Sequence, residues 1–365
     1  MTALRIAVFA LGAFCALATF FSAIRTVVLP RAVRARISRA VFLAVRSLFR
    51  LRIRRDASYE RIDHVMASYA PTALLTLVLV WEGSVLLSYT LMFWALQGDS
   101  LREAFITAGS SLLTLGFTHP ESFAQVGLAF SAAAIGLVIL ALLITYLPSL
   151  YTAFSRREQM VQLLEVRAGS PPAPLEMFTR AHRIGRMERL GAIWPEWERW
   201  FADLEETHTS FPALVFFRSS RPGDSWVTAA GTILDAAALA QSTLDVPNNP
   251  DASLCIRAGF LCLRRIAGFF GVPFDPDPRP DDPISIARDE FDDLCDAMAA
   301  EGIALKPDRD QAWRDYAGWR VNYDAVLLAL AAITLAPVSP WVSDRSGPYS
   351  RDLSRSGRIR IRNRS

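Results

Sequence analysis

The stretch from Ser100 to Pro120 reads SLREAFITAGSSLLTLGFTHP, and it decides how the N-terminal part of the chain is interpreted. Ser100 and Glu103 have the spacing of a capping box, in which each side chain bonds the other residue's backbone amide, so a helix is predicted to begin at Leu101. Its apolar residues continue to Leu113. A helix of this length is too short to cross a bilayer. Because Pro120 and an irregular polar segment follow it, the chain is expected to turn back toward the side from which it came.

Apolar segments flank this short helix and also precede it. Crossing a bilayer takes about 20 apolar residues. Three segments meet that length: Arg5 to Arg25, Tyr69 to Leu96 with Glu82 as its only charge, and Phe123 to Pro148. A signal peptide is the alternative for the first segment, but its positive flank lies mainly on the C-terminal side. With 52% hydrophobic residues in 365, the chain is predicted to be a membrane protein.

Arginine placement predicts the orientation, since positive loops stay in the cytoplasm. Arg156 and Arg157 follow the third span. The arginines between the first two spans are Arg31, Arg34, Arg36, Arg39, Arg46, Arg50, Arg52, Arg54, Arg55 and Arg61. With three spans, both basic regions are inside only if the N-terminus is outside and the C-terminus is cytoplasmic. We therefore expect a multi-pass protein of a bacterial plasma membrane, with residues 97–122 as an external connection.

An external connection with a short helix and an irregular return describes a re-entrant loop. In this arrangement the sequence resembles the potassium-channel pore family, whose pattern is an outer helix, a pore helix, a T-x-G-[YF]-G filter and a glycine-bearing inner helix. The matching parts lie between Tyr69 and Arg156: the second span, the helix Leu101–Leu113, the run Thr114-Leu115-Gly116-Phe117-Thr118, and the third span with Gly136. The resemblance implies a homotetramer that conducts potassium ions and needs no other cofactor. It also implies K+ at the backbone carbonyls of Thr114, Leu115, Gly116 and Phe117, which replace the water shell of the ion.

Each filter position has a physical role in this interpretation. Gly116 allows backbone conformations that are closed to residues with a Cβ. Thr114 adds a hydroxyl at the inner entrance, and Phe117 packs sideways to hold the ring open. Thr118 replaces the second glycine of the family, and a threonine rarely adopts the left-handed conformation, so the outermost ion site is expected to be weaker. Single-glycine loops also resemble those of Trk/Ktr-type potassium transporters, which carry four such loops in one chain.

Three further residues are assigned to the surroundings of the filter. His119 follows it at the pore mouth, where a histidine can change charge in the physiological pH range. Glu82 is an ionisable group inside a span, and such residues tend to be functional. With Ser100 and Glu103, it is predicted to support the pore helix, or else to face the opening. Gly136 is predicted to be either an inner-helix hinge or a small residue at a helix contact.

The basic stretch between the first two spans has an amphipathic pattern. Its apolar residues are Val33, Ile37, Val41, Ala44, Val45, Leu48 and Leu51. They share one helical face beside arginines, which predicts a helix on the inner membrane surface, attracted to anionic lipids at residues 31–55. A solvated linker that obeys the positive-inside rule is the alternative.

The C-terminal half is predicted to be a soluble helical domain. Helices are expected near residues 175–189, 194–206, 225–242, 252–270, 284–302 and 308–334, and the apolar run Ala325–Ala336 is expected in the core. No nucleotide-binding, P-loop or hydrolase motif occurs, so we predict no enzyme activity. Cys15, Cys255, Cys262 and Cys295 lack metal-site spacing. The net charge of +3 gives no reason to expect nucleic-acid binding.

The predicted fold class is all-α: a membrane pore domain of three transmembrane helices and a re-entrant pore helix, followed by the soluble helical domain. The predicted divisions are 1–29, 30–66, 67–156, 157–174, 175–344 and a disordered basic tail, 345–365. The domain 175–344 is expected to alter gating through an unknown ligand or protein. Two other classes of function stay open: a non-conducting receptor or scaffold that keeps the pore architecture, and a membrane-anchored enzyme with its site in the helical domain.

Overall fold

The computed structural model describes residues 2–28, 36–53, 58–97 and 100–345. Within these ranges the chain is helical and contains no strand, which confirms the all-α prediction. Clustering of contacts divides it into two compact units. The first unit comprises Met1–Ala57 and Val65–Thr152, and the second comprises Ser58–His64 and Ala153–Ser365.

Three long apolar helices form the first unit: α1 (Thr2–Val27), α4 (Tyr69–Gln97) and the N-terminal part of α6 (Phe123–Ala168). All three are long and apolar enough to cross a membrane, as the sequence predicted. Helix α6 continues through Pro148, although proline removes one backbone hydrogen bond. The helix that follows the third span is thus an extension of that span, without a break.

Helices α1 and α4 approach each other closely. A Cβ built on Gly12 would lie 2.7 Å from the carbonyl oxygen of Ser88, a distance that real Cβ atoms do not reach. Small residues at such a crossing let two backbones come together, and packing of this kind drives helix association in lipid.

Helix α2 (Arg36–Leu51) also packs against α4. It buries Val41, Val45 and Phe49, and the Tyr69 hydroxyl at the start of α4 donates a 3.1 Å hydrogen bond to the Phe42 carbonyl. The amphipathic helix of the sequence analysis is therefore present, but Val41 and Val45 of the face predicted to meet the membrane are buried in the first unit. The predicted face included Leu48 and Leu51, which are 63% and 83% exposed. Val41, Val45 and Phe49 are spaced by four residues, so they form one stripe on the side of α2 that packs against α4.

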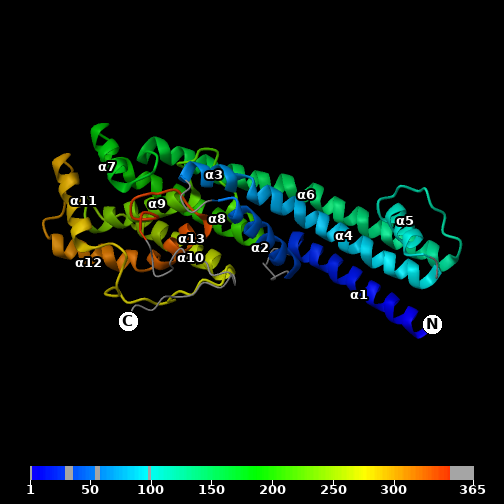
Figure 1. The fold of residues 1–365 in the computed structure, drawn as a ribbon. Helices are drawn as coiled ribbons and strands as arrows, with labels where there is room; N and C mark the ends of the chain where they lie inside the picture. Colours follow the sequence, from blue (N-terminus) through cyan, green and yellow to red (C-terminus); the bar gives the residue numbers. More distant parts are fainter. Residues whose placement is uncertain (1, 29–35, 54–57, 98–99, 346–365) are drawn as a thin grey trace. The chain divides into compact units, whose positions relative to one another are not determined.

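A short helix, α5 (Leu101–Leu112), lies between α4 and α6 in the chain, and Figure 1 shows it with its loop at the junction of these two helices. It begins at the predicted residue. The N-terminal end of α1 lies near the same end of the first unit (Figure 1). Helix α3 (Tyr59–Ala67) starts in the second unit and leads directly into α4.

The second unit is a helical bundle built around α9 (Trp226–Ser242), which is buried along nearly its whole length. The other helices are α7 (Pro174–Arg183), α8 (Trp194–Ser210), α10 (Pro250–Phe269), α11 (Arg288–Ala300), α12 (Arg309–Arg320) and α13 (Asp324–Thr334), with 3-10 turns η1 (Met187–Ile193) and η2 (Pro212–Phe216). Helix α13 lies in the core, as predicted for the run Ala325–Ala336. The predicted tail lies outside the described residues beyond Arg345.

The single helix predicted over 308–334 is wrong, because the chain turns between α12 and α13. The turn lets Arg320 and Tyr323 converge on Asp235 of α9. The Arg320 guanidinium lies 2.7 Å from the Asp235 carboxylate, and both side chains are fully buried. Tyr316 and Tyr323 also donate to this carboxylate, so the buried charges are fully bonded. A buried pair satisfied in this way fixes the packing of three helices.

Candidate functional site

The start of α5 is set by its cap. The Ser100 hydroxyl accepts a hydrogen bond from the Glu103 backbone amide at 3.3 Å, and Ser100 has the extended backbone of an N-cap residue. Glu103 lies in the first helical turn, where a carboxylate interacts favourably with the helix dipole. Ser100 and Glu103, which were predicted to support the short helix, therefore lie at its N-terminal end, where the cap bond joins them.

Ser110 organises the loop that follows α5. Its hydroxyl is buried and accepts hydrogen bonds from the amides of Phe117, at 3.1 Å, and Thr118, at 3.3 Å. Its carbonyl accepts the Leu115 amide at 2.8 Å, and the Thr114 amide bonds the Ser111 carbonyl. The loop is thus folded over the C-terminal end of α5, with most of its amides directed back to the helix.

The loop carbonyls are left without such partners. Within the described residues, no hydrogen bond to a carbonyl oxygen from Thr114 to Thr118 occurs. Most backbone amides of the loop are therefore bonded to α5, whereas its backbone carbonyls accept no hydrogen bond in the described chain. Backbone carbonyls of this kind can coordinate a hard cation in place of water. No cluster of three or more His, Cys, Asp or Glu side chains that could hold a metal occurs among the described residues.

Two loop residues have left-handed backbone conformations. Gly116 has φ of +72°, which the absence of a Cβ permits at no steric cost. Thr114 has φ of +54°, a conformation rare for a β-branched residue and strained by about 1–3 kcal/mol. Thr118 is not among the positive-φ residues, as expected for a threonine at the place of the second glycine, and its hydroxyl is buried without a partner in the described chain. Of the three non-glycine residues with positive φ in the described chain, Thr114 lies in the run that resembles a filter, and Leu335 and Trp341 lie in the second unit.

Gly136 of α6 meets the end of α5. A Cβ built on it would lie 2.5 Å from the Leu112 carbonyl oxygen and 3.0 Å from Leu112 Cδ1. Only glycine permits this approach, so the geometry favours the close-contact interpretation of Gly136 over the hinge. A second link in the first unit joins Tyr89 of α4 to Ser131 of α6, with a 3.0 Å hydrogen bond.

Glu82 lies on α4 with both carboxyl oxygens buried and without a hydrogen-bond partner in the described chain. Leu86, one turn further along the same face, contacts α5 at Gly109. Within the described chain, Glu82 forms no hydrogen bond with α5. The predicted support of the short helix by Glu82 is therefore not made through a direct hydrogen bond.

Apolar and titratable side chains of the loop face outward. Leu115 and Phe117 are 58% and 61% exposed, and His119 is exposed as well. Phe117 was predicted to pack sideways, and within its own chain its ring is mostly uncovered.

In the second unit, a five-residue segment from Leu214 to Arg218 joins two elements that lead to the first unit. Arg157, on the extension of α6, is fully buried and donates to the carbonyls of Leu214, at 2.9 Å, and Phe217, at 2.7 Å. It also pairs with Glu158 at 2.7 Å. The extension of the third span is therefore bonded directly to this segment.

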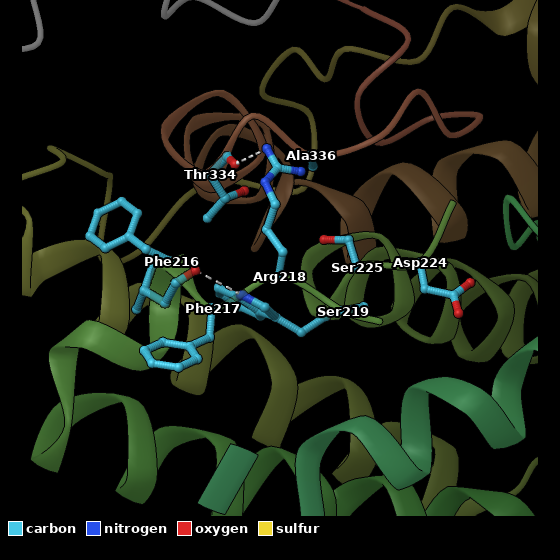
Figure 2. A pocket seen from close by; sticks show the side chains of 10 residues that line it. Phe216, Phe217, Arg218, Ser219, Asp224, Ser225, Thr334 and Ala336 are labelled. Carbon is cyan, nitrogen blue, oxygen red and sulfur yellow. Dashed lines mark hydrogen bonds between the residues drawn. The ribbon is translucent and has the colours of Figure 1, made fainter. Parts of the chain in front are cut away.

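Arg218, at the end of this segment, holds α3. Its guanidinium lies 2.6 Å from the Asp63 carboxylate, and both side chains are largely buried. It also donates to the carbonyls of Thr334 and Leu335 at the end of α13. Figure 2 shows Arg218 reaching toward Thr334. The cavity beside it has a volume of about 20 Å³, room for one water molecule and too small for an organic substrate.

His208 lies beneath Arg157. Its Nε2 is 3.2 Å from the Arg157 guanidinium, and its ring packs against Trp226. Burial, together with the adjacent arginine charge, holds the pKa of His208 well below its usual range. The imidazole is therefore neutral and accepts a hydrogen bond from Arg157.

Sequence reasoning found the cap, the loop and Gly136, but it missed Ser110, Arg157 and Arg218 as organising residues. Ser110 has one signal in the sequence, a hydroxyl at the end of a short helix before a glycine-containing turn. No protein-family model matches the chain, and neither a curated protein nor a solved structure matches it significantly.

Proposed function

We propose that the protein is a potassium-channel-like, cation-conducting pore in a membrane. The observation that carries this proposal is the division of the loop into bonded amides and free carbonyls, from Thr114 to Thr118. An ion that sheds its water needs several fixed oxygen atoms, and the loop offers them without competing donors.

The short helix supports this function in two ways. Its 12 residues span about 18 Å, enough to carry a loop roughly half-way through a hydrocarbon core about 30 Å thick. Its C-terminal end carries the partial negative charge of the helix dipole. The loop follows that end, so the dipole favours a cation beside the free carbonyls.

A closed ring of carbonyls needs more than one loop, and the described part of the chain contributes one. We therefore propose a homotetramer in which exposed side chains such as Phe117 meet neighbouring copies. Arginine placement supports an external N-terminus and a cytoplasmic C-terminus. Potassium and rubidium are expected to permeate, with sodium excluded less strictly than in two-glycine filters, because Thr118 lacks the left-handed conformation of a second glycine.

The second unit is proposed to regulate conduction. The segment from Leu214 to Arg218 bonds both the extension of α6 and the start of α3, which leads into α4. The two spans that flank the loop are thereby tied to one short segment. A ligand or protein that displaces this segment would act on both spans together, and this segment is the best candidate for gating from the second unit.

Reconstitution in liposomes tests the function directly. Purified wild-type protein should carry rubidium or potassium down a gradient, and Gly116→Ala should lose most of this flux while still inserting, because alanine strains a backbone at φ of +72°. Gly83→Ala, at a position with open space around it, is the matched control and should conduct.

Two outcomes of this assay would contradict the proposal. Folded wild-type protein without flux under all conditions would favour the non-conducting receptor or scaffold. Full flux in Gly116→Ala would place the ion path elsewhere. A monomer or dimer in native mass measurements would remove the closed ring.

A further inference from the structure

Helix α2 presents two outward stripes besides the face buried on α4. Leu43, Leu48 and Leu51 are exposed and span an arc of about 140°, with the small residues Ala40, Ala44 and Ser47 between them. At 100° per residue, Arg39 and Arg50 border this arc on the side of Leu43, and they lie roughly 100–120° from Leu51. These two exposed residues form the arginine stripe, and Arg46 on the same side of α2 is half-buried.

The arginine stripe has no acidic counterpart. Helix α2 contains no acidic residue, and the exposed Arg39 and Arg50 form no ion pair with any described residue. Charge complementarity therefore calls for an anionic occupant. A leucine stripe beside an arginine stripe is the pattern of a helix lying in the interface plane, with leucine among acyl chains and arginine at phosphates.

The place of α2 selects a lipid surface as this occupant. Tyr69, the first residue of α4, is bonded to Phe42 and packs edge-on against Phe49. Helix α2 is thus fixed at the end of an apolar span, the level at which the hydrocarbon core gives way to headgroups.

We infer that α2 is a membrane-interface helix whose Leu43–Leu48–Leu51 stripe enters an anionic leaflet while Arg39 and Arg50 contact lipid phosphates. The lipid-facing stripe is rotated from the one that the sequence suggested, since Val41 and Val45 are taken up by α4. This inference requires the membrane embedding of the chain, but it is independent of ion conduction.

Spin labels on the full-length protein in lipid nanodiscs test this orientation. Single cysteines are placed by Leu43→Cys, Leu48→Cys and Leu51→Cys in a chain whose four native cysteines are replaced. Leu79→Cys, exposed on the middle of α4, gives the lipid reference, and Asp293→Cys in the second unit gives the water reference. Accessibility to oxygen and to a water-soluble nickel complex is then measured.

The α2 labels should resemble Leu79→Cys, with several-fold greater accessibility to oxygen than to nickel. Labels that resemble Asp293→Cys would overturn the inference, because the stripe would face water. Labels inaccessible to both reagents would overturn it too, because protein would cover the stripe.

The charge requirement is tested in discs with and without phosphatidylglycerol. Protection of Leu48→Cys from nickel should increase several-fold with the anionic lipid, and Arg39→Gln with Arg50→Gln should remove most of that increase. Arg314→Gln with Arg265→Gln, exposed arginines of the second unit, is the control and should leave it unchanged. Equal protection in both lipids would contradict the role of the arginines.

Discussion

Replacing Gly136 by alanine tests the contact that joins α5 to α6. The new Cβ would lie 2.5 Å from the Leu112 carbonyl oxygen, whereas a carbon and an oxygen in ordinary contact are about 3.3 Å apart. The end of α5 must therefore move from α6 by about 0.8 Å, or α6 must bend. Leu112 directly precedes the loop, so the displacement passes to the carbonyls from Thr114 onward.

The magnitude follows from two opposing effects. Alanine is a better helix former than glycine by about 1 kcal/mol, which alone would stabilise α6. Overpacking at a rigid backbone costs about 1–3 kcal/mol. Gly136→Ala should therefore lower the free energy of unfolding by up to about 2 kcal/mol net, and it should remove most of the cation flux.

Gly127→Ala on the same helix is the matched control, since a Cβ there meets nothing within 4 Å. It should keep its flux and gain up to about 1 kcal/mol of stability. Unfolding of both variants in a detergent titration and rubidium uptake into liposomes give the two readouts. If Gly136→Ala matched Gly127→Ala in both, α6 would not fix the loop and the reasoning from the close contact would fail.

Three further changes test other parts of the argument. Ser110→Ala removes the acceptor of two loop amides, so it should cost about 1–3 kcal/mol and weaken potassium-over-sodium selectivity in the flux assay. Arg218→Gln leaves the largely buried Asp63 carboxylate unpaired, so thermal unfolding should show a loss of about 3 kcal/mol and the flux should change. His208 is neutral when folded but gains a proton near pH 6.5 when unfolded. Stability should therefore fall below that pH by up to about 1.4 kcal/mol per pH unit, and His208→Gln should flatten this slope.

Each of these changes has a control close at hand. Ser111→Ala removes only a bond inside α5 and should leave selectivity intact. Arg221→Gln breaks an exposed pair with Glu165 and should cost under about 1 kcal/mol. For His208→Gln, the wild-type chain measured over the same pH range is the reference. Selectivity lost equally in both serine variants, or a steep slope retained in His208→Gln, would contradict the assigned contacts.

Local patterns in the sequence predicted the elements well where one effect dominates. Uninterrupted apolar runs predicted α1, α4 and α6, and the Ser100–Glu103 spacing predicted the first residue of α5. The sequence-based prediction failed where a contact between residues far apart in the chain determines the local structure. The turn between α12 and α13 exists because Asp235, far away in the chain, needs the side chains on both sides of it.

Part of the predicted membrane face of α2, Val41 and Val45, is buried in protein for a similar reason. Apolar periodicity identifies a helix that buries a stripe, but it does not identify what covers that stripe. Both Val45 and Leu48 fit the predicted face, and only contact with α4 separates the buried one from the exposed one. A helix with two apolar stripes can meet protein and lipid at once.

The loop itself shows why a short motif is an incomplete description of this site. Thr114 has a left-handed backbone that its own side chain disfavours, so residues outside the TLGF run must impose it. Bonds from the loop amides to Ser110 hold one side, and the close approach of Gly136 fixes the helix end from which the loop departs. Because these constraints come from α5 and α6, the same four residues in another setting would relax. The carbonyl arrangement therefore depends on Ser110 and Gly136 as much as on Gly116.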